Sequence, residues 1–238
     1  MPKIKAWISA ARLRTLPLSL SGIIVGTALG SMYSQFQWGI FIFALLTTVA
    51  FQITSNFAND YGDGVKGTDN ENRVGPMRAL QSGQLSRHEL KIGIIISIII
   101  CVFLIVALLY LSFGTKNLLF TLIFGALGIL SIWAAIKYTV GTSAYGYKGL
   151  GDLFVFLFFG LLGVAIGLLS TGVLNLNNLR DYESDRTSHK NTLIVKMGIK
   201  NGKTYHVFLI LISFISMLAF TFIHYENWKN TIHLVAFV

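Results

Sequence analysis

No charged residue stands between Arg14 and Asp60, and this long uncharged run limits what the chain can fold into. About 20 apolar residues of helix are enough to cross the hydrocarbon core of a bilayer. A polar stretch at residues 31–37 divides the run, so we expect two membrane spans, at residues 16–33 and 38–58. The composition agrees, because 54% of the residues are hydrophobic and only 12% are charged.

Four more uncharged runs follow, at residues 92–115, 117–136, 153–179 and 204–225. In hydrocarbon the backbone must satisfy its own hydrogen bonds, and these runs lack the alternating polarity of a barrel strand. They therefore predict helices. We expect an all-α fold, a polytopic transmembrane helix bundle with six spans, forming one domain over residues 1–238.

The positions of the basic residues make nucleic-acid binding a poorer explanation of the net charge of +9 than a membrane orientation signal. Four basic residues lie before residue 15, five in 60–91, two in 137–148 and six in 180–203, and only Lys116 and Lys229 lie elsewhere. Such clustering follows the positive-inside rule and predicts a cytoplasmic N-terminus and three cytoplasmic loops. The single cysteine, Cys101, is expected to be a small packing residue within a helix.

Two places along the chain do not fit a simple count of membrane spans. The run at 153–179 is long enough for one span but too short for two, and one crossing would put the basic residues of 180–203 on the wrong side. Either the charge rule fails there, or the run is a shortened hairpin, or about one span and a loop are absent. Gly160, Gly163, Gly167 and Gly172 permit a hairpin, although close helix packing explains them better. The apolar run at 231–238 predicts a truncated C-terminus.

A first group of polar side chains stands at the expected end of the second span, in SNFANDYGDGVKGTD. Asn56, Asp60 and Asp63 have i, i+4 and i+7 spacing, so on a continuous helix they share one face. Asn59 and Asp69 belong to the same stretch. Polar residues are costly at membrane depth, which makes these residues candidates for function.

A second group follows the 153–179 run, in NNLRDYESDRTSHKNTL. Asp181 and Asp185 have i, i+4 spacing, Glu183 points elsewhere, and Asn178 lies one turn earlier with Asn177. Two such groups facing each other would supply hard oxygen ligands while leaving coordination positions open. That arrangement suits Mg²⁺, which keeps sites for water and for substrate phosphates.

The polar residues also allow simpler interpretations. Each carboxylate taken alone could be a solvated loop residue, no 12-residue EF-hand loop fits, and the five histidines lack the paired spacing of a zinc site. Arg73, Arg78 and Lys190 could bind phosphate oxygens or could be ordinary positive-inside charge. The glycine- and tyrosine-rich loop at 138–152 could line an acceptor pocket with Tyr145, Tyr147 and Lys148.

Four stretches together resemble the UbiA superfamily of intramembrane aromatic prenyltransferases, and within it the 1,4-dihydroxy-2-naphthoate polyprenyltransferase branch of menaquinone biosynthesis. They are ARLRTLPLSLSGIIVG, NFANDYGDGVKGTD with GPMRALQSG, YGYKGLGDLFVFLFFG, and VLNLNNLRDYESDRTSHKNTL. The resemblance implies an Mg²⁺-dependent enzyme of a bacterial cell membrane. Such an enzyme transfers a polyprenyl group from polyprenyl diphosphate to 1,4-dihydroxy-2-naphthoate with decarboxylation, giving demethylmenaquinone.

The resemblance also implies roles for particular residues. The metal–diphosphate ligands implied are Asn56, Asn59, Asp60, Asp63 and Asp69 from the first motif, and Asp181 and Asp185 from the second. Arg73, Arg78 and Lys190 match positions near the diphosphate.

The sequence departs from the family in three respects. The family has nine transmembrane helices, it has a longer segment between FVFLFFG and NNLRD, and it usually has glycine at the position of His189. Three alternatives stay open: a branch acting on 4-hydroxybenzoate or a similar acceptor, a cation-binding transporter, and an inactive truncated homologue.

Overall fold

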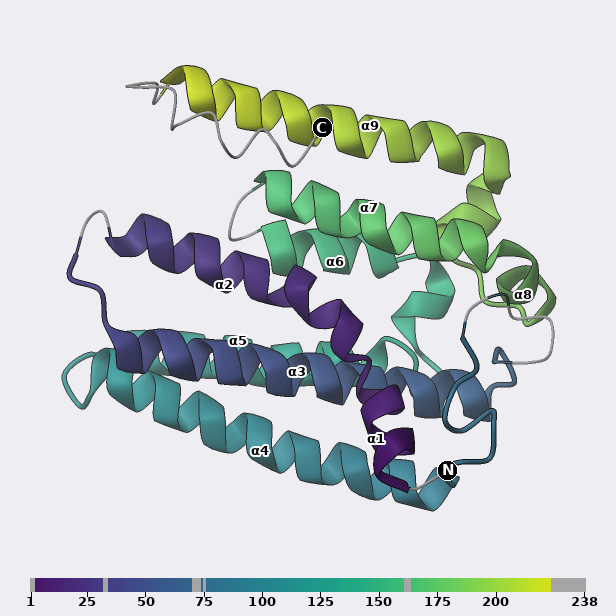
Figure 1. The fold of residues 1–238 in the computed structure, drawn as a ribbon, viewed down its shortest axis with the longest axis horizontal. Helices are drawn as coiled ribbons and strands as arrows, with labels where there is room; N and C mark the ends of the chain where they lie inside the picture. The colour runs from purple at the N-terminus through teal and green to yellow at the C-terminus, as the bar shows by residue number, and fades with distance from the viewer. Residues whose placement is uncertain (1–2, 32–33, 70–73, 75, 161–163, 224–238) are drawn as a thin grey trace.

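The computed structural model describes residues 3–31, 34–69, 74, 76–160 and 164–223, and all regular elements within these ranges are helical. In chain order they are α1 (Lys3–Ala11), η1 (Leu13–Thr15), α2 (Leu16–Ser31), α3 (Trp38–Val65), α4 (Arg87–Phe113), α5 (Leu118–Lys137), η2 (Tyr145–Lys148), α6 (Gly151–Gly160), α7 (Val164–Arg180), α8 (Tyr182–Thr187) and α9 (Leu193–Ile223). Figure 1 shows the long helices lying side by side. The all-α prediction is confirmed.

Five segments of the described chain are long and apolar enough to cross a membrane. They are Lys3–Ser31, Trp38–Val65, Arg87–Phe113, Leu118–Lys137 and Leu193–Ile223. The chain is therefore a multi-pass membrane protein. Five of the six expected spans are found among these segments. The expected C-terminal truncation concerns residues 231–238, which lie outside the described ranges.

The prediction of a sixth span at 153–179 is wrong, because this run forms two helices. Helix α6 has 10 residues and α7 has 17, which gives lengths of about 15 Å and 25 Å. The two pack against each other as a short hairpin, so the chain returns to the end from which it entered (Figure 1). The shortened hairpin was one of the three alternatives left open by the sequence.

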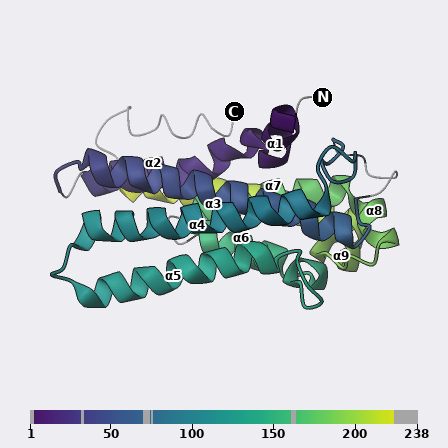
Figure 2. The same cartoon turned by 90° about the horizontal axis from the view of Figure 1, so that it is seen from below.

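The hairpin removes the conflict with the charge pattern. Among the described residues, every Asp and Glu lies at the end of the bundle where α3 ends and α4, α6 and α8 begin. Of the described lysines and arginines, Lys116 alone lies at the opposite end, in the turn between α4 and α5. Figure 2 shows that turn at one extreme of the molecule and α8 at the other. We call the α8 side the charged end.

Local sequence signals explain where the helices at the charged end begin and bend. Helix α4 starts with a capping box, in which the Ser86 hydroxyl accepts a hydrogen bond from the Glu89 amide and the Glu89 carboxylate accepts one from the Ser86 amide. Helix α9 bends at Gly198, whose φ of 82° interrupts the helix. Its first turns therefore cross the charged end before the remainder enters the membrane.

The N-terminal helix is held against the bundle by small residues. Ala6, Ala10 and Ala11 are buried together with Phe57 and Leu90, and small side chains allow helices to approach closely in a membrane. A second cluster joins α3, α4 and α5 and contains Cys101, which is fully buried. The prediction that Cys101 is a packing residue is confirmed. A β-carbon at Gly172 would lie 3.6 Å from a side-chain atom of Ile210 in α9, an ordinary van der Waals contact.

Gly62 allows α3 to touch the loop that follows α5. A β-carbon at this position would lie 2.6 Å from the Thr139 hydroxyl oxygen and 2.7 Å from the Thr139 carbonyl carbon. Backbone atoms cannot move aside as a side-chain tip can. This contact places the last turns of α3 beside the tyrosine-rich loop.

Gly62→Ala should lower the free energy of unfolding by about 1–3 kcal/mol, because the added methyl overpacks against backbone. The measurement is thermal unfolding in detergent. Unfolding is monitored by the reaction of Cys101, which is buried in the folded protein, with a thiol-reactive dye. Gly30→Ala is the matched control, since nothing lies within 4 Å of a β-carbon there. Equal melting temperatures for the two variants would contradict the close contact.

The hairpin predicts a labelling pattern for single cysteines introduced into a Cys101→Ala background. Ser143→Cys and Arg186→Cys should react with an impermeant thiol reagent from one side of the membrane, and Lys116→Cys from the other, because an α6–α7 hairpin does not change sides. Labelling of Arg186→Cys from the same side as Lys116→Cys would mean that the chain crosses once between residues 151 and 180.

Candidate active site

The first predicted group stands on the last turns of α3, which continues to Val65 as one helix. Asn56, Asp60 and Asp63 are each at least 97% buried and all line one cavity, so the predicted common face is confirmed. Asp69 follows in the loop after the helix.

The second predicted group lies at the junction of α7 and α8. The Asp185 amide donates to the Asp181 carbonyl at 2.8 Å, which keeps these two residues one turn apart although α7 ends at Arg180. Asn178 lies in the last turn of α7, beside the same cavity. The Ser184 hydroxyl donates to the Thr68 carbonyl at 3.1 Å and so joins α8 to the loop after α3.

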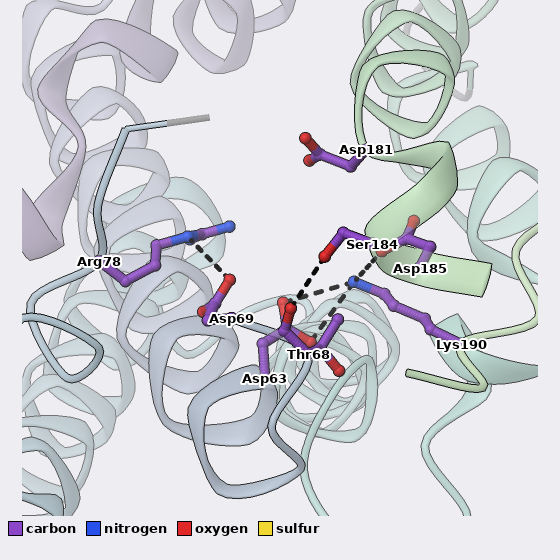
Figure 3. A pocket seen from close by; sticks show the side chains of 8 residues that line it. All are labelled: Asp63, Thr68, Asp69, Arg78, Asp181, Ser184, Asp185 and Lys190. Atoms are coloured by element: carbon purple, nitrogen blue, oxygen red, sulfur yellow. Dashed lines mark hydrogen bonds and ion pairs between the residues drawn. The ribbon is translucent and has the colours of Figure 1, made fainter. Parts of the chain in front are cut away.

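The two groups meet in a single pocket at the charged end. Figure 3 shows its lining: Asp63, Thr68, Asp69, Arg78, Asp181, Ser184, Asp185 and Lys190. We call it the acidic pocket. Its volume is about 20 Å³, enough for one water-sized occupant. Residues separated by more than 110 positions in the sequence thus share one small space, as the sequence predicted.

Lys190 lies between the carboxylates of the two groups. Its ammonium nitrogen is 3.4 Å from both carboxylate oxygens of Asp63 and 3.8 Å from Oδ1 of Asp185. Burial alone would lower the pKa of Lys190, but the negative charges of Asp63 and Asp185 outweigh it and leave the pKa raised. The ammonium therefore keeps its proton.

Two arginines accompany the remaining carboxylates. The Arg78 Nε lies 3.6 Å from Oδ1 of Asp69. Arg180 makes two parallel hydrogen bonds of 2.8 Å to the carboxylate of its neighbour Asp181. Paired arginines of this kind also suit phosphate oxygens, which accept the same two-pronged hydrogen bonds.

Asp60 and the two asparagines lie deeper than the acidic pocket. The Ala79 amide donates to Oδ2 of Asp60 at 3.3 Å, and the buried Oδ1 has no hydrogen-bond partner within the described residues. Asn56 donates to the Ala11 carbonyl at 2.8 Å, so its amide ties the N-terminal segment to α3. Asn59 accepts from the Thr139 hydroxyl. These three residues line the larger cavity rather than the acidic pocket.

The larger cavity has a volume of about 1100 Å³ and extends from the charged end between the helices. Asp63, Arg78, Asp181 and Lys190 line both spaces, so the two spaces adjoin each other. Apolar side chains form much of the wall, from α2, α3, α6 and α7: Leu18, Ile23, Phe51, Phe154, Val155, Val173 and Leu174. The cavity can therefore take a ligand with a charged head and an apolar body.

The residues of the tyrosine-rich loop differ in how they contact the site. The Tyr147 hydroxyl donates to Oδ1 of Asp63 at 2.8 Å, and burial followed by the Asp63 charge raises the pKa of Tyr147, so the phenol keeps its proton. Tyr145 lines the large cavity and stacks on Phe154 with ring centroids 4.1 Å apart. Lys148 is exposed and lines neither space.

Some residues of the site were missed by the sequence analysis, and one predicted residue is not described. Thr68 and Ser184 line the acidic pocket, but ordinary hydroxyl residues carry no sequence signal. Arg12 lines the large cavity from a left-handed backbone conformation, with φ of 51°. The position of this arginine just before an expected span is the sequence signal that could have indicated its place in the site. Arg73 lies outside the described residues.

The acidic pocket fits a hard divalent cation in its donor chemistry. Four carboxylates line it, with an arginine and a lysine suited to phosphate. Within the described residues no three His, Cys, Asp or Glu side chains converge on a single ion position. Mg²⁺ does not need such a cage, because it usually binds one or two carboxylates and completes its shell with water and substrate phosphates.

The long helices can cross a membrane, and carboxylates and basic side chains gather at one end beside a cavity with apolar walls. These features define an intramembrane protein that binds amphipathic, anionic ligands. Comparison with known proteins makes the class specific. The chain belongs to the UbiA prenyltransferase family, whose model matches residues 19–164 and 112–238. The resemblance seen in the four sequence stretches is confirmed. No solved structure matches the chain.

The curated relatives agree with one another. The 1,4-dihydroxy-2-naphthoate octaprenyltransferase of Haemophilus influenzae is 42% identical, over 98% of this chain and 82% of the relative. The protein of the same name from Escherichia coli is 40% identical, with the same two coverages. That of Mycobacterium tuberculosis is 32% identical over 96% of this chain and 81% of the relative.

The alignments also support a shortened interior. The match to the Haemophilus influenzae protein extends over 256 positions, which exceeds the 238 residues of this chain by 18. At least that many positions of the relative therefore lack a counterpart here. A difference of this size equals about one span.

His189 allows a direct test of the turn that directs Lys190 into the acidic pocket. Its φ is 55°, in the left-handed region that favours glycine, and the Lys190 amide donates to the Asp185 carbonyl at 2.8 Å. These are features of a Schellman helix end. His189→Gly should raise the free energy of unfolding by about 1 kcal/mol, because the left-handed strain disappears.

The change in stability is measured by thermal unfolding, again monitored by the reaction of Cys101 with a thiol-reactive dye. Ser188→Gly is the control, since Ser188 has a φ of −90° and should lose stability on replacement by glycine. A lower melting temperature for His189→Gly would contradict the strained turn.

Proposed function

We propose that this chain transfers a polyprenyl group from polyprenyl diphosphate to 1,4-dihydroxy-2-naphthoate. The names of its relatives support this substrate pair, at identities up to 42% over nearly the whole chain. The observation that carries the proposal is the meeting of Asp63 with Asp181 and Asp185 in one pocket that adjoins a cavity with apolar walls. A prenyl diphosphate has the matching shape, with an anionic head and a long hydrocarbon tail.

In the proposed reaction the bond between the prenyl C1 and the diphosphate oxygen breaks, and C1 forms a bond to the ring carbon that bears the carboxylate. The electron pair of the ring–carboxylate bond returns to the ring as CO₂ leaves. The products are diphosphate, CO₂ and demethylmenaquinone in its reduced form. Mg²⁺ would be held by Asp60, Asp63, Asp69, Asp181 and Asp185, with Asn56 nearby, and when bound would neutralise charge on the leaving diphosphate.

The side chains of this chain supply binding and orientation. Arg78 and Lys190, with Arg73 and Asn178, are proposed to bind diphosphate oxygens, since arginine pairs with such oxygens through two hydrogen bonds. Tyr147 fixes the Asp63 carboxylate by its hydrogen bond of 2.8 Å. Asn59 and Tyr145 would face the acceptor ring in the large cavity, where holding both reactants in place lowers the barrier. Lys148 remains the weakest of the proposed substrate contacts, because it is exposed.

We further propose that residues 1–238 act as one domain in a bacterial cell membrane, with the charged end in the cytoplasm. The clustering of basic residues at that end supports this orientation through the positive-inside rule. A cytoplasmic pocket would meet Mg²⁺ from the water and the diphosphate head of the donor at the interface, while the tail of the donor stays in lipid.

A cation transporter is less well supported. Transport needs charged or polar groups along a path through the bilayer midplane. The carboxylates of the described chain all gather at one end. The family match favours group transfer as well.

Asp63→Asn and Asp181→Asn should each reduce transfer about 100-fold or more, because each removes a negative charge from the proposed cation site. The measurement is Mg²⁺-dependent transfer from a labelled polyprenyl diphosphate to 1,4-dihydroxy-2-naphthoate in isolated membranes. EDTA should abolish transfer and added Mg²⁺ should restore it.

Glu183→Gln provides the matched control. Glu183 lies between Asp181 and Asp185 in sequence but is exposed and lines neither the acidic pocket nor the large cavity. Its replacement should leave transfer unchanged. If the Asp63 and Asp181 variants retained the activity of the Glu183 variant at equal protein levels, the proposed site would be wrong.

A further inference from the structure

Lys190 occupies a position that both acidic groups share. Its ammonium lies 3.4 Å from each oxygen of Asp63 and 3.8 Å from Asp185. The three side chains are between 89% and 95% buried, so water screens the charges little. A cation bound by Asp63 and Asp185 together would need the same space between them.

The contacts of the Lys190 ammonium with the carboxylates are longer than typical hydrogen bonds. Charge-assisted nitrogen–oxygen hydrogen bonds are typically about 2.7–2.9 Å long, and all three distances here are longer. The backbone of Lys190 is fixed by its amide bond to the Asp185 carbonyl, after the left-handed turn at His189. The four-carbon side chain can therefore swing while its Cα stays in place.

The surroundings give the displaced ammonium a place to go. The Lys190 nitrogen lies 5.3 Å from the Tyr147 ring centroid, but the Lys66 nitrogen lies nearer to the same ring, at 3.8 Å. Lys190 also lines the large cavity, where the diphosphate of a donor would meet it. A rotation of the side chain toward this cavity would bring the ammonium from the carboxylate oxygens to the phosphate oxygens of a bound donor.

We propose that Lys190 is an internal counter-cation that competes with the divalent ion for Asp63 and Asp185, and that it transfers to the diphosphate when ion and donor bind together. The inference rests on the proposed function for the identity of the donor, but not for the competition itself. It makes ion binding and diphosphate binding mutually favourable, because each removes an obstacle to the other. The pocket thereby takes up little divalent ion until a diphosphate is present.

The first test measures the ion alone. Lys190→Met keeps an unbranched side chain that is one atom shorter, and it removes the charge. Mn²⁺, used as a spectroscopic substitute for Mg²⁺, should therefore bind about tenfold more tightly without diphosphate, given the strength of one nearby charge. Binding is followed by electron paramagnetic resonance on protein in nanodiscs. With Mn²⁺ present, inorganic pyrophosphate should bind more weakly to the variant. Lys200→Met, at an exposed position outside both spaces, is the control and should change neither affinity.

The second test uses the unaltered protein, so it does not depend on the variant folding. The extent to which an amine-reactive reagent modifies Lys190 is quantified by mass spectrometry and compared with the modification of Lys200. Mn²⁺ alone should increase the reactivity of Lys190, because the ammonium leaves the carboxylates, and pyrophosphate added afterwards should lower it again. Unchanged reactivity, or Mn²⁺ affinity that stays equal or falls in folded Lys190→Met, would overturn the inference.

Neither measurement requires turnover or a naphthoate. If the transfer assay fails while the Mn²⁺ effects hold, the proposed reaction is wrong and the ion competition remains. If the Mn²⁺ effects fail while transfer depends on Asp63 and Asp181, the reaction stands and Lys190 is only a phosphate ligand.

Discussion

Two carboxylates from distant parts of the sequence share the ammonium of Lys190, and the charged end of the molecule depends on this contact. Without it Asp63 and Asp185 would face each other nearly buried, and their repulsion would push apart the end of α3 and the start of α8. The hydrogen bond between Ser184 and the Thr68 carbonyl joins the same two segments. The end of α3 and the start of α8 are thus joined at the acidic pocket.

Much of this arrangement could be predicted from sequence, because the cost of placing charge in hydrocarbon leaves few solutions. The uncharged runs predicted helices and their number nearly correctly, and the i, i+4, i+7 spacing of Asn56, Asp60 and Asp63 predicted their common face. The meeting of the two acidic groups followed from the rule that basic loops gather on one side. The family resemblance added residue roles that spacing alone does not provide.

Other features depend on contacts that sequence does not reveal. The 153–179 run has the length of one span, and only the packing of α6 against α7 shows that it folds back. The spacing of Asn56 predicted its helix face, but not that its amide donates to the Ala11 carbonyl, a contact that depends on the packing of α1 onto α3. Lys190 was expected near phosphate, whereas its place between two carboxylates depends on the left-handed turn at His189. Such tertiary pairings have no periodic signal.

The shortness of the α6–α7 hairpin also affects the lipid around it. Helix α6, about 15 Å long, covers only half of a hydrocarbon core that is about 30 Å thick, whereas α3 and α4 cross it fully. A hydrophobic segment that is shorter than the hydrocarbon core is accommodated by local thinning of the bilayer. We therefore expect the bilayer to be thinner beside α6 than beside α3 and α4, and membrane thickness becomes one of the conditions under which this fold is stable.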